Sequence, residues 1–321
     1  MNKRERVKNA MDKRPVDHVP VGFWHHFAPD KSLGEACAQA HVDYFRSTDL
    51  DFIKVQATNY FAYPLPKIEK ASDWRKLRPI GRDDPYIRDQ VWRAKRIVEL
   101  TGGECCVFYT LFAPFSSIRF GSSDEHVMRH LREDELSVRH ALDVIAQDNA
   151  LLGELLITEA GCDGVYFCVQ GGEESRMDGE TYRRAVMPSD RYVLDRANWY
   201  SDYNILHCCG YGGEKNRLAI WKDYPAKAVN WAVHVEELPL PEGRELFGNR
   251  CCLGGFATLH MHDNVYSGLI HSGTKEEIQA ETRRIILDHG KRGLMLGGDC
   301  VLSPDIPDER IRWIVEAARS I

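Results

Sequence analysis

The 321-residue sequence lacks any long apolar run and any cluster of positive charge. No stretch reaches the roughly 18 consecutive apolar residues that a membrane-spanning helix needs. Residues 1–21, MNKRERVKNAMDKRPVDHVPV, carry charges throughout and have no apolar centre of the kind found in signal peptides. The net charge is −6 without a run of Lys or Arg, which argues against nucleic acid and membranes as partners. We therefore expect a cytoplasmic protein.

A glycine-rich turn for binding phosphate is missing after the first strand-like segment, where residues 21–30 read VGFWHHFAPD. This absence argues against a doubly wound open sheet, the rival fold. Eight near-continuous apolar runs occur instead, a pattern typical of buried parallel strands. The expected strands are 19–24, 51–56, 105–112, 164–170, 203–209, 228–234, 251–256 and 293–298.

Most gaps between these strands contain apolar residues at helical spacing. The expected helices lie within 82–100, 133–161, 189–201, 274–290 and 308–321. Eight strands alternating with helices predict a single (β/α)8 TIM barrel over residues 1–321, with a helical extension at the N-terminus. A homodimer is compatible with the sequence, because interface helices of such barrels look like ordinary amphipathic ones.

In a TIM barrel the active site lies at the C-terminal ends of the strands. Residues that are distant in sequence are therefore expected to meet in one largely neutral and aromatic cup. The strand-end residues are His25, His26, Gln56, Asn59, Phe112 to Phe115, Gln170, His207, Cys209, Asn230, His234, Phe256, Asp299 and Cys300.

Ten cysteines are present, and by default they are free thiols packed as small apolar side chains. His207 and Cys209 are an exception, because side chains two residues apart on a strand face the same way, with Cα atoms roughly 6.5 Å apart. Cys208 should point to the opposite face, and Cys300 follows the last strand as a third ligand. One imidazole and two thiolates favour zinc, and three protein ligands leave a fourth position open for catalysis.

Four stretches of the chain resemble the uroporphyrinogen decarboxylase superfamily, and within it the zinc-dependent, cobalamin-linked methyltransferases. RERVKNAMDKRPVDHVPVGFW is similar to the superfamily's entry into the first strand, and LFAPFSSIRFG to its segment after the third strand. LHCCG matches the His-x-Cys-Gly motif of the methyltransferases, and GGDCVLSPDIPDERIRWIVEAAR resembles their closing segment.

The resemblance implies Zn²⁺ held by His207, Cys209 and Cys300. It also implies methyl transfer between a corrinoid (methylcobalamin), carried by a partner protein, and a small-molecule substrate. Zinc would activate either a thiol acceptor or an ether or amine donor, and the sequence leaves the direction open. A non-catalytic barrel that binds zinc or thiols is one alternative.

A uroporphyrinogen decarboxylase is the other alternative, and it fits the sequence less well. That branch carries an Arg-Gln-Ala-Gly-Arg stretch after the first strand, where this chain reads HHFAPDKS. It also carries an aspartate at the end of the second strand, where this chain reads IKVQATNY. A substrate with many carboxylates needs a basic cup, which the strand-end residues do not offer.

Supporting catalytic roles are expected for four strand-end residues. His25 or His26 would orient the substrate or move a proton, and Gln170 would hydrogen-bond the substrate. Asp299 would hydrogen-bond the imidazole of a zinc ligand, since such histidines usually have a partner. Ordinary loop or turn positions remain the alternative for these residues.

Three further residues are expected to bind the cofactors. Asn230 or His234 would complete the zinc shell, and Phe115 would help shape a pocket for a flat methyl donor. Packing within the barrel is the alternative for each of them.

Overall fold

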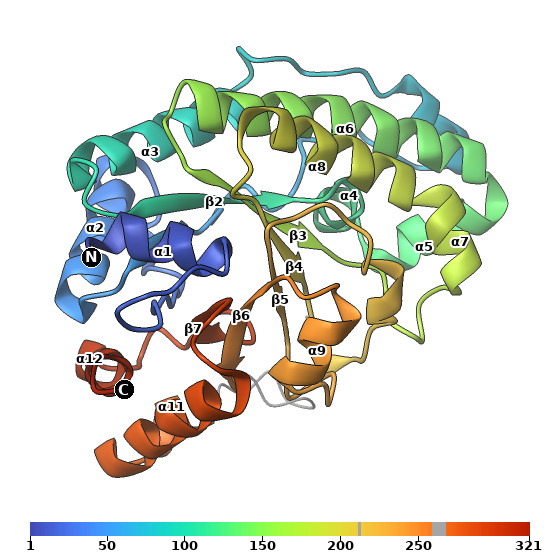
Figure 1. Ribbon diagram of the computed structural model, residues 1–321. Coiled ribbons are helices and arrows are strands. Elements are labelled where there is room, and N and C mark those ends of the chain that lie inside the picture. Colours follow the sequence, from blue (N-terminus) through green and yellow to red (C-terminus); the bar gives the residue numbers. More distant parts are fainter. Residues whose placement is uncertain (211–212, 259–267) are drawn as a thin grey trace.

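The protein, described here by a computed structural model over residues 1–210, 213–258 and 268–321, is built around one curled parallel sheet (Figure 1). Its seven strands follow one another in sequence order, so each pairs with the next. The strands are β1 Phe52–Val55, β2 Cys106–Phe112, β3 Gly164–Val169, β4 Ile205–Cys208, β5 Ala228–Trp231, β6 Cys251–Phe256 and β7 Leu294–Gly298. This is the architecture of a TIM barrel, so the predicted fold class is confirmed.

The first of the expected strands is an extended segment with isolated bridges rather than a regular strand. Gly22 N donates to Leu296 O (2.9 Å), and Leu296 N donates to Pro20 O (2.8 Å). On the other side, Asp51 N donates to Val21 O (2.9 Å). The segment thus lies between β7 and β1. Pro20 has no N–H to donate, which limits regular pairing at this point.

Helices surround the sheet, and the five helices expected from the sequence are all present as α3, α6, α8, α11 and α12. The helices are α1 Lys3–Met11, α2 Gly34–Thr48, α3 Pro85–Thr101, α4 Pro114–Gly121, α5 Asp124–Glu133, α6 Glu135–Thr158, α7 Gly179–Ala185, α8 Met187–Tyr200, α9 Leu240–Leu246, α10 Leu269–Ser272, α11 Lys275–His289 and α12 Asp308–Arg319. Thr274 and Glu277 form a capping box at the start of α11. In the described ranges, no helix has the length and apolar character to cross a membrane.

Helix α1 is the predicted N-terminal extension, and it packs against β1, β2 and β7 at one end of the barrel (Figure 1). Val7, Ala10 and Met11 join a buried cluster that includes Phe108 and Met295 from the strands. This end of the barrel is therefore filled by apolar side chains, which leaves the opposite, C-terminal ends of the strands for a site.

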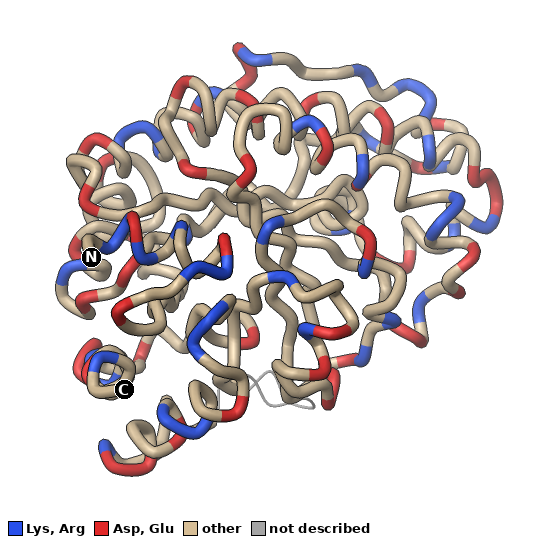
Figure 2. Tube along the Cα trace, viewed as in Figure 1, with Lys and Arg blue, Asp and Glu red and all other residues tan. Residues whose placement is uncertain are grey.

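Charged residues lie mainly on the helices and loops, with acidic and basic residues interspersed in the view of Figure 2. All ten cysteines are free thiols. Nine of them are buried, and only Cys300 is partly exposed. Cys106 and Cys251 belong to the apolar cluster beneath α1, as expected for thiols that pack as small apolar groups.

A candidate metal centre at the strand ends

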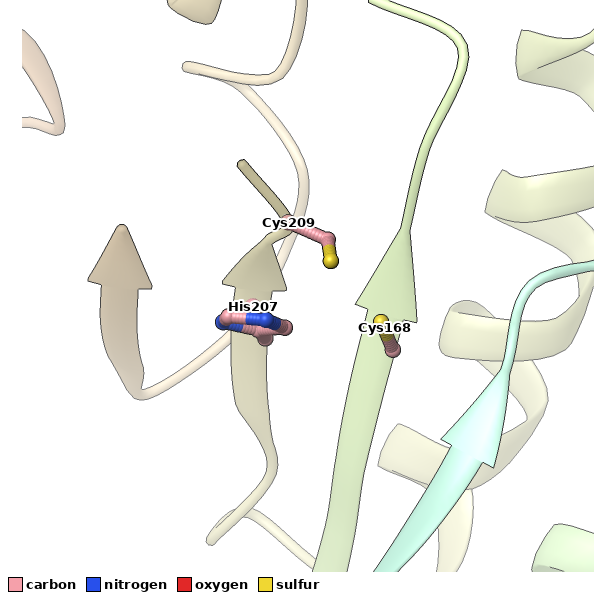
Figure 3. Close-up of side chains that lie close together, drawn as sticks. All are labelled: Cys168, His207 and Cys209. Atoms are coloured by element: carbon pink, nitrogen blue, oxygen red, sulfur yellow. The ribbon is translucent and has the colours of Figure 1, made fainter. Parts of the chain in front are cut away.

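Two neighbouring strands bring an imidazole and two thiols together. Cys168 on β3 is paired in register with His207 on β4, and Cys209 follows β4 directly. The sulfurs of Cys168 and Cys209 and a ring nitrogen of His207 all lie within 4.8 Å of one another. Figure 3 shows the three side chains facing the same space. All three residues are buried, so this is an enclosed group of metal-ligand types.

Cys300 reaches the same imidazole from the end of β7. Its Sγ lies 3.9 Å from Nε2 of His207, across 93 positions of sequence. The structure thus gathers the three residues expected to bind metal and adds Cys168, which the sequence analysis missed. A signal for Cys168 was available, because it stands two residues before Gln170 and shares its strand face.

The orientation of His207 is set by Asn230. The Asn230 amide nitrogen donates to Leu253 O (2.8 Å) and Gly298 O (3.2 Å), so its Oδ1 must accept hydrogen bonds. Oδ1 accepts from Tyr166 Oη (2.5 Å) and from Nδ1 of His207 (2.5 Å). The proton of His207 is therefore on Nδ1, and the lone pair of Nε2 faces the sulfurs. A metal-binding histidine usually donates its other ring N–H to a hydrogen-bond acceptor, and Asn230 is that acceptor for His207.

Asp299 was expected to be that partner, but the structure places it elsewhere. Its carboxylate accepts hydrogen bonds from Val233 N (3.0 Å), His234 N (3.2 Å) and His234 Nδ1 (3.0 Å). The hydrogen bond that His234 Nδ1 donates to Asp299 raises the pKa of His234, whose side chain is 46% exposed. β5 ends at Trp231 and the chain then turns, and His234 is not part of the group formed by Cys168, His207 and Cys209.

A cavity of about 300 Å³ opens above the cluster. Five aromatic residues and three cysteines are among the residues that line it. These residues are Trp24, Phe61, Phe112, Phe120, Tyr166, Cys168, Cys209 and Cys300. Phe115, expected to help form the pocket, is instead fully buried in the core. It stands at the start of α4 and packs so closely against Gly171 that a Cβ there would lie 2.6 Å from its ring.

Gln170 also lines the cavity and has a defined orientation. Its Oε1 accepts from Arg119 Nη1 (3.1 Å), and its Nε2 points to Cys209 Sγ at 3.4 Å. Hydrogen bonds from the thiols of Cys168 and Cys300 hold the pKa of Cys209 well below its ordinary value. The same contact, together with burial, raises the pKa of Cys300.

His25 and His26 face different surroundings. His26 lines the cavity and contacts Thr58 Oγ1 through Nδ1 at 3.0 Å. Burial lowers the pKa of His26 to about 4, so its ring is neutral near pH 7. His25 packs edge-on against Phe27 and Tyr44, with centroids 4.7 and 4.5 Å away. Of the two expected histidines, only His26 is in a position to meet a substrate in this cavity.

Lys54 also lines the cavity, although it is not one of the strand-end residues expected from the sequence. It is 5% exposed, and its Nζ donates to Gln56 Oε1 (2.5 Å). The ammonium also lies over the rings of Trp24 (5.1 Å) and Tyr166 (4.7 Å). Burial lowers the pKa of Lys54 to about 8, an effect that the nearby cysteine sulfurs partly oppose. The sequence feature that could have identified Lys54 as a site residue is its position as a lysine inside the otherwise apolar strand segment FIKV.

The fold and the site together define an α/β barrel whose strand ends gather one imidazole and three thiols beneath an aromatic cavity. The chain belongs to the uroporphyrinogen decarboxylase family: residues 47–321 match the family described as Uroporphyrinogen decarboxylase (URO-D).

Individual relatives include proteins named as methyltransferases. The chain is 22% identical to the methylcobamide:CoM methyltransferase MtbA of Methanosarcina mazei, with 99% of this chain and 97% of that protein covered. Among solved structures, a methyltransferase from Methanosarcina mazei superposes with a TM-score of 0.76 at 16% identity, covering 100% of this chain and 98% of the other. A B12-independent methionine synthase from a Shewanella species gives 0.59 at 13% identity, covering 94% and 97%.

Proposed function

We propose that the protein is a zinc-dependent methyltransferase. It moves a methyl group between a corrinoid, carried by a partner protein, and a small-molecule substrate that is a thiol acceptor or an ether or amine donor. The observation that carries the proposal is the group formed by His207, Cys209 and Cys300 at the base of an aromatic cavity. The similarity to a methylcobamide:CoM methyltransferase over nearly the whole chain supports the reaction class.

The residues present fit a zinc ion. His207 offers a lone pair on Nε2 because Asn230 holds the proton on Nδ1, and Cys209 and Cys300 offer soft sulfur donors. When bound, zinc would lower the pKa of a substrate thiol, so that a nucleophilic thiolate is available near neutral pH.

Other side chains of the cavity have roles that follow from their contacts. Gln170 directs an N–H toward Cys209 and so stabilises negative charge on that sulfur. The neutral ring of His26 is available to hydrogen-bond a substrate or to accept a proton at the cavity wall. Trp24 and Phe112 line the cavity, and their apolar rings would limit the access of water to a bound substrate, which would strengthen these interactions.

The cavity is a poor match for a porphyrinogen substrate. Among the lining residues that the structure describes, Lys54 is the only Lys or Arg, and it is buried between two aromatic rings. Eight carboxylates would need several cationic partners. This composition favours methyl transfer over the decarboxylation after which the family is named.

The proposal is tested by incubating zinc-loaded protein with methylcobalamin and 2-mercaptoethanesulfonate (coenzyme M) or homocysteine, and by measuring the methyl thioether. We expect product with at least one thiol and a loss of at least a hundredfold in Cys300→Ser, with Cys208→Ala as the matched control. Release of CO2 from uroporphyrinogen, without demethylation of methylcobalamin by any thiol, would contradict the proposal.

A further inference from the structure

We infer that Cys168 is a fourth, displaceable metal ligand, which fills the position that the sulfur of the substrate takes during the reaction. The inference rests on the metal-binding part of the proposed function. Its basis is the compact group in which the sulfur of Cys168 lies within 4.8 Å of both the His207 ring nitrogen and the sulfur of Cys209.

The backbone holds Cys168 firmly beside the other donors. Cys168 is paired with Phe112 on β2 and with His207 on β4, so its strand is flanked on both sides. Its carbonyl also accepts a hydrogen bond from Ala113 N (2.9 Å). With the backbone held in this way, rotation about the Cα–Cβ bond of Cys168 is the motion that would move its sulfur toward or away from a metal.

Charge balance in the pocket favours three thiolates. A dication with Cys209 and Cys300 as thiolates is neutral, which leaves the buried ammonium of Lys54 uncompensated. In the part of the chain that the structure describes, Lys54 has no carboxylate partner, and its contacts are Gln56 and two aromatic rings. Burial of an unpaired charge is unfavourable. A third thiolate from Cys168 would make the whole group neutral.

The same balance explains how a substrate can enter. A thiol substrate that replaces Cys168 also contributes one thiolate, so the total charge of the pocket does not change. The proton that the substrate thiol loses is taken up by the released sulfur of Cys168. Cys168 thus protects the metal at rest and yields its position to a thiol without leaving Lys54 unbalanced.

The test uses cobalt(II) as a spectroscopic replacement for zinc in the full-length protein. The absorption from thiolate to cobalt reports how many sulfurs bind the metal. We expect wild-type protein to show three thiolates, and Cys168→Ala to lose about one third of this absorption because one sulfur of three is gone. Addition of 2-mercaptoethanesulfonate should restore the band in Cys168→Ala and leave the wild-type intensity unchanged.

Cys208→Ala is the matched control, because Cys208 is a buried neighbour in the hydrophobic core and lies outside the metal-ligand group. It should bind cobalt with the wild-type spectrum. Cys168→Ser keeps the volume of the site and should reproduce the loss if Cys168→Ala folds poorly. Wild-type absorption in both Cys168 variants, or an equal loss in Cys208→Ala, would overturn the inference while leaving the proposed function intact. Failure of the wild-type protein to bind cobalt or zinc would instead overturn the metal-dependent function.

Discussion

Oδ1 of Asn230 lies 2.5 Å from Nδ1 of His207, and this contact determines which imidazole nitrogen can bind a metal. Asn230 is itself fixed by two hydrogen bonds from its amide to backbone carbonyls of β6 and β7. The strand register therefore sets the proton on His207 and turns its free nitrogen toward Cys300. The affinity of the site for metal should depend on Asn230, although this residue is not itself a ligand.

Replacement of Asn230 by leucine should weaken zinc binding by about 10- to 100-fold, because His207 would lose the partner that orients its ring. Competition with a chromophoric chelator measures this affinity. Tyr166→Phe is the control, since it removes the other donor to Oδ1 and leaves the contact with His207 in place. Equal zinc affinity in Asn230→Leu and wild-type protein would show that the contact does not position the ligand.

His26 and His25 should differ in their effect on turnover. His26→Ala should lower kcat/KM by about tenfold or more, because one hydrogen bond at the cavity wall is worth about 1.4 kcal/mol. His25→Ala removes a ring that packs against Phe27 and Tyr44, so it should reduce stability and leave KM nearly unchanged. Steady-state kinetics and thermal unfolding of both variants test this, and a larger kinetic effect from His25 would contradict it.

Lys54 should make the stability of the metal-free protein depend on pH. Its pKa falls from 10.5 to about 8 on folding, so the folded protein releases this proton first. Between about pH 8 and 10.5 the unfolded chain binds more protons, and this contribution to stability therefore rises with pH. Below pH 8 the unfavourable burial of the ammonium is fully present.

Lys54→Met should therefore be more stable than wild-type protein at pH 7, by at most about 3 kcal/mol. The difference should shrink as the pH approaches 10.5. Urea unfolding of both proteins at each pH gives the comparison, and the thiols shared by both proteins cancel in the difference. A wild-type protein that is more stable than the variant at pH 7 would show that contacts with Gln56 and the rings outweigh desolvation.

The strands and the longer helices could be predicted from the sequence because buried parallel strands read as apolar runs and the helices between them are amphipathic. The two-residue spacing of His207 and Cys209 predicted that both lie on one face of a strand. Cys300 was expected beside them because the C-terminal ends of the strands meet at one end of a TIM barrel. The expected strand at residues 19–24 is the main local difference between prediction and structure. Pro20 limits its pairing, so this segment forms only isolated bridges.

The missed site residues depend on relationships that one strand alone does not reveal. Cys168 requires the register between β3 and β4. Asn230, and not Asp299, is the partner of His207 because of where β5 ends and the chain turns, since this turn directs two backbone N–H groups to Asp299. Lys54 enters the cavity because two aromatic rings from other segments receive its ammonium.

X-ray absorption spectroscopy on purified protein tests the metal site most directly. We expect one zinc per chain, with sulfur ligands at about 2.3 Å and one nitrogen ligand at about 2.0–2.1 Å. Cys300→Ser should lose a sulfur ligand or the zinc itself, while Cys208→Ala should keep both. Zinc bound without sulfur, or unchanged metal and ligands in Cys300→Ser, would contradict a centre built from His207, Cys209 and Cys300.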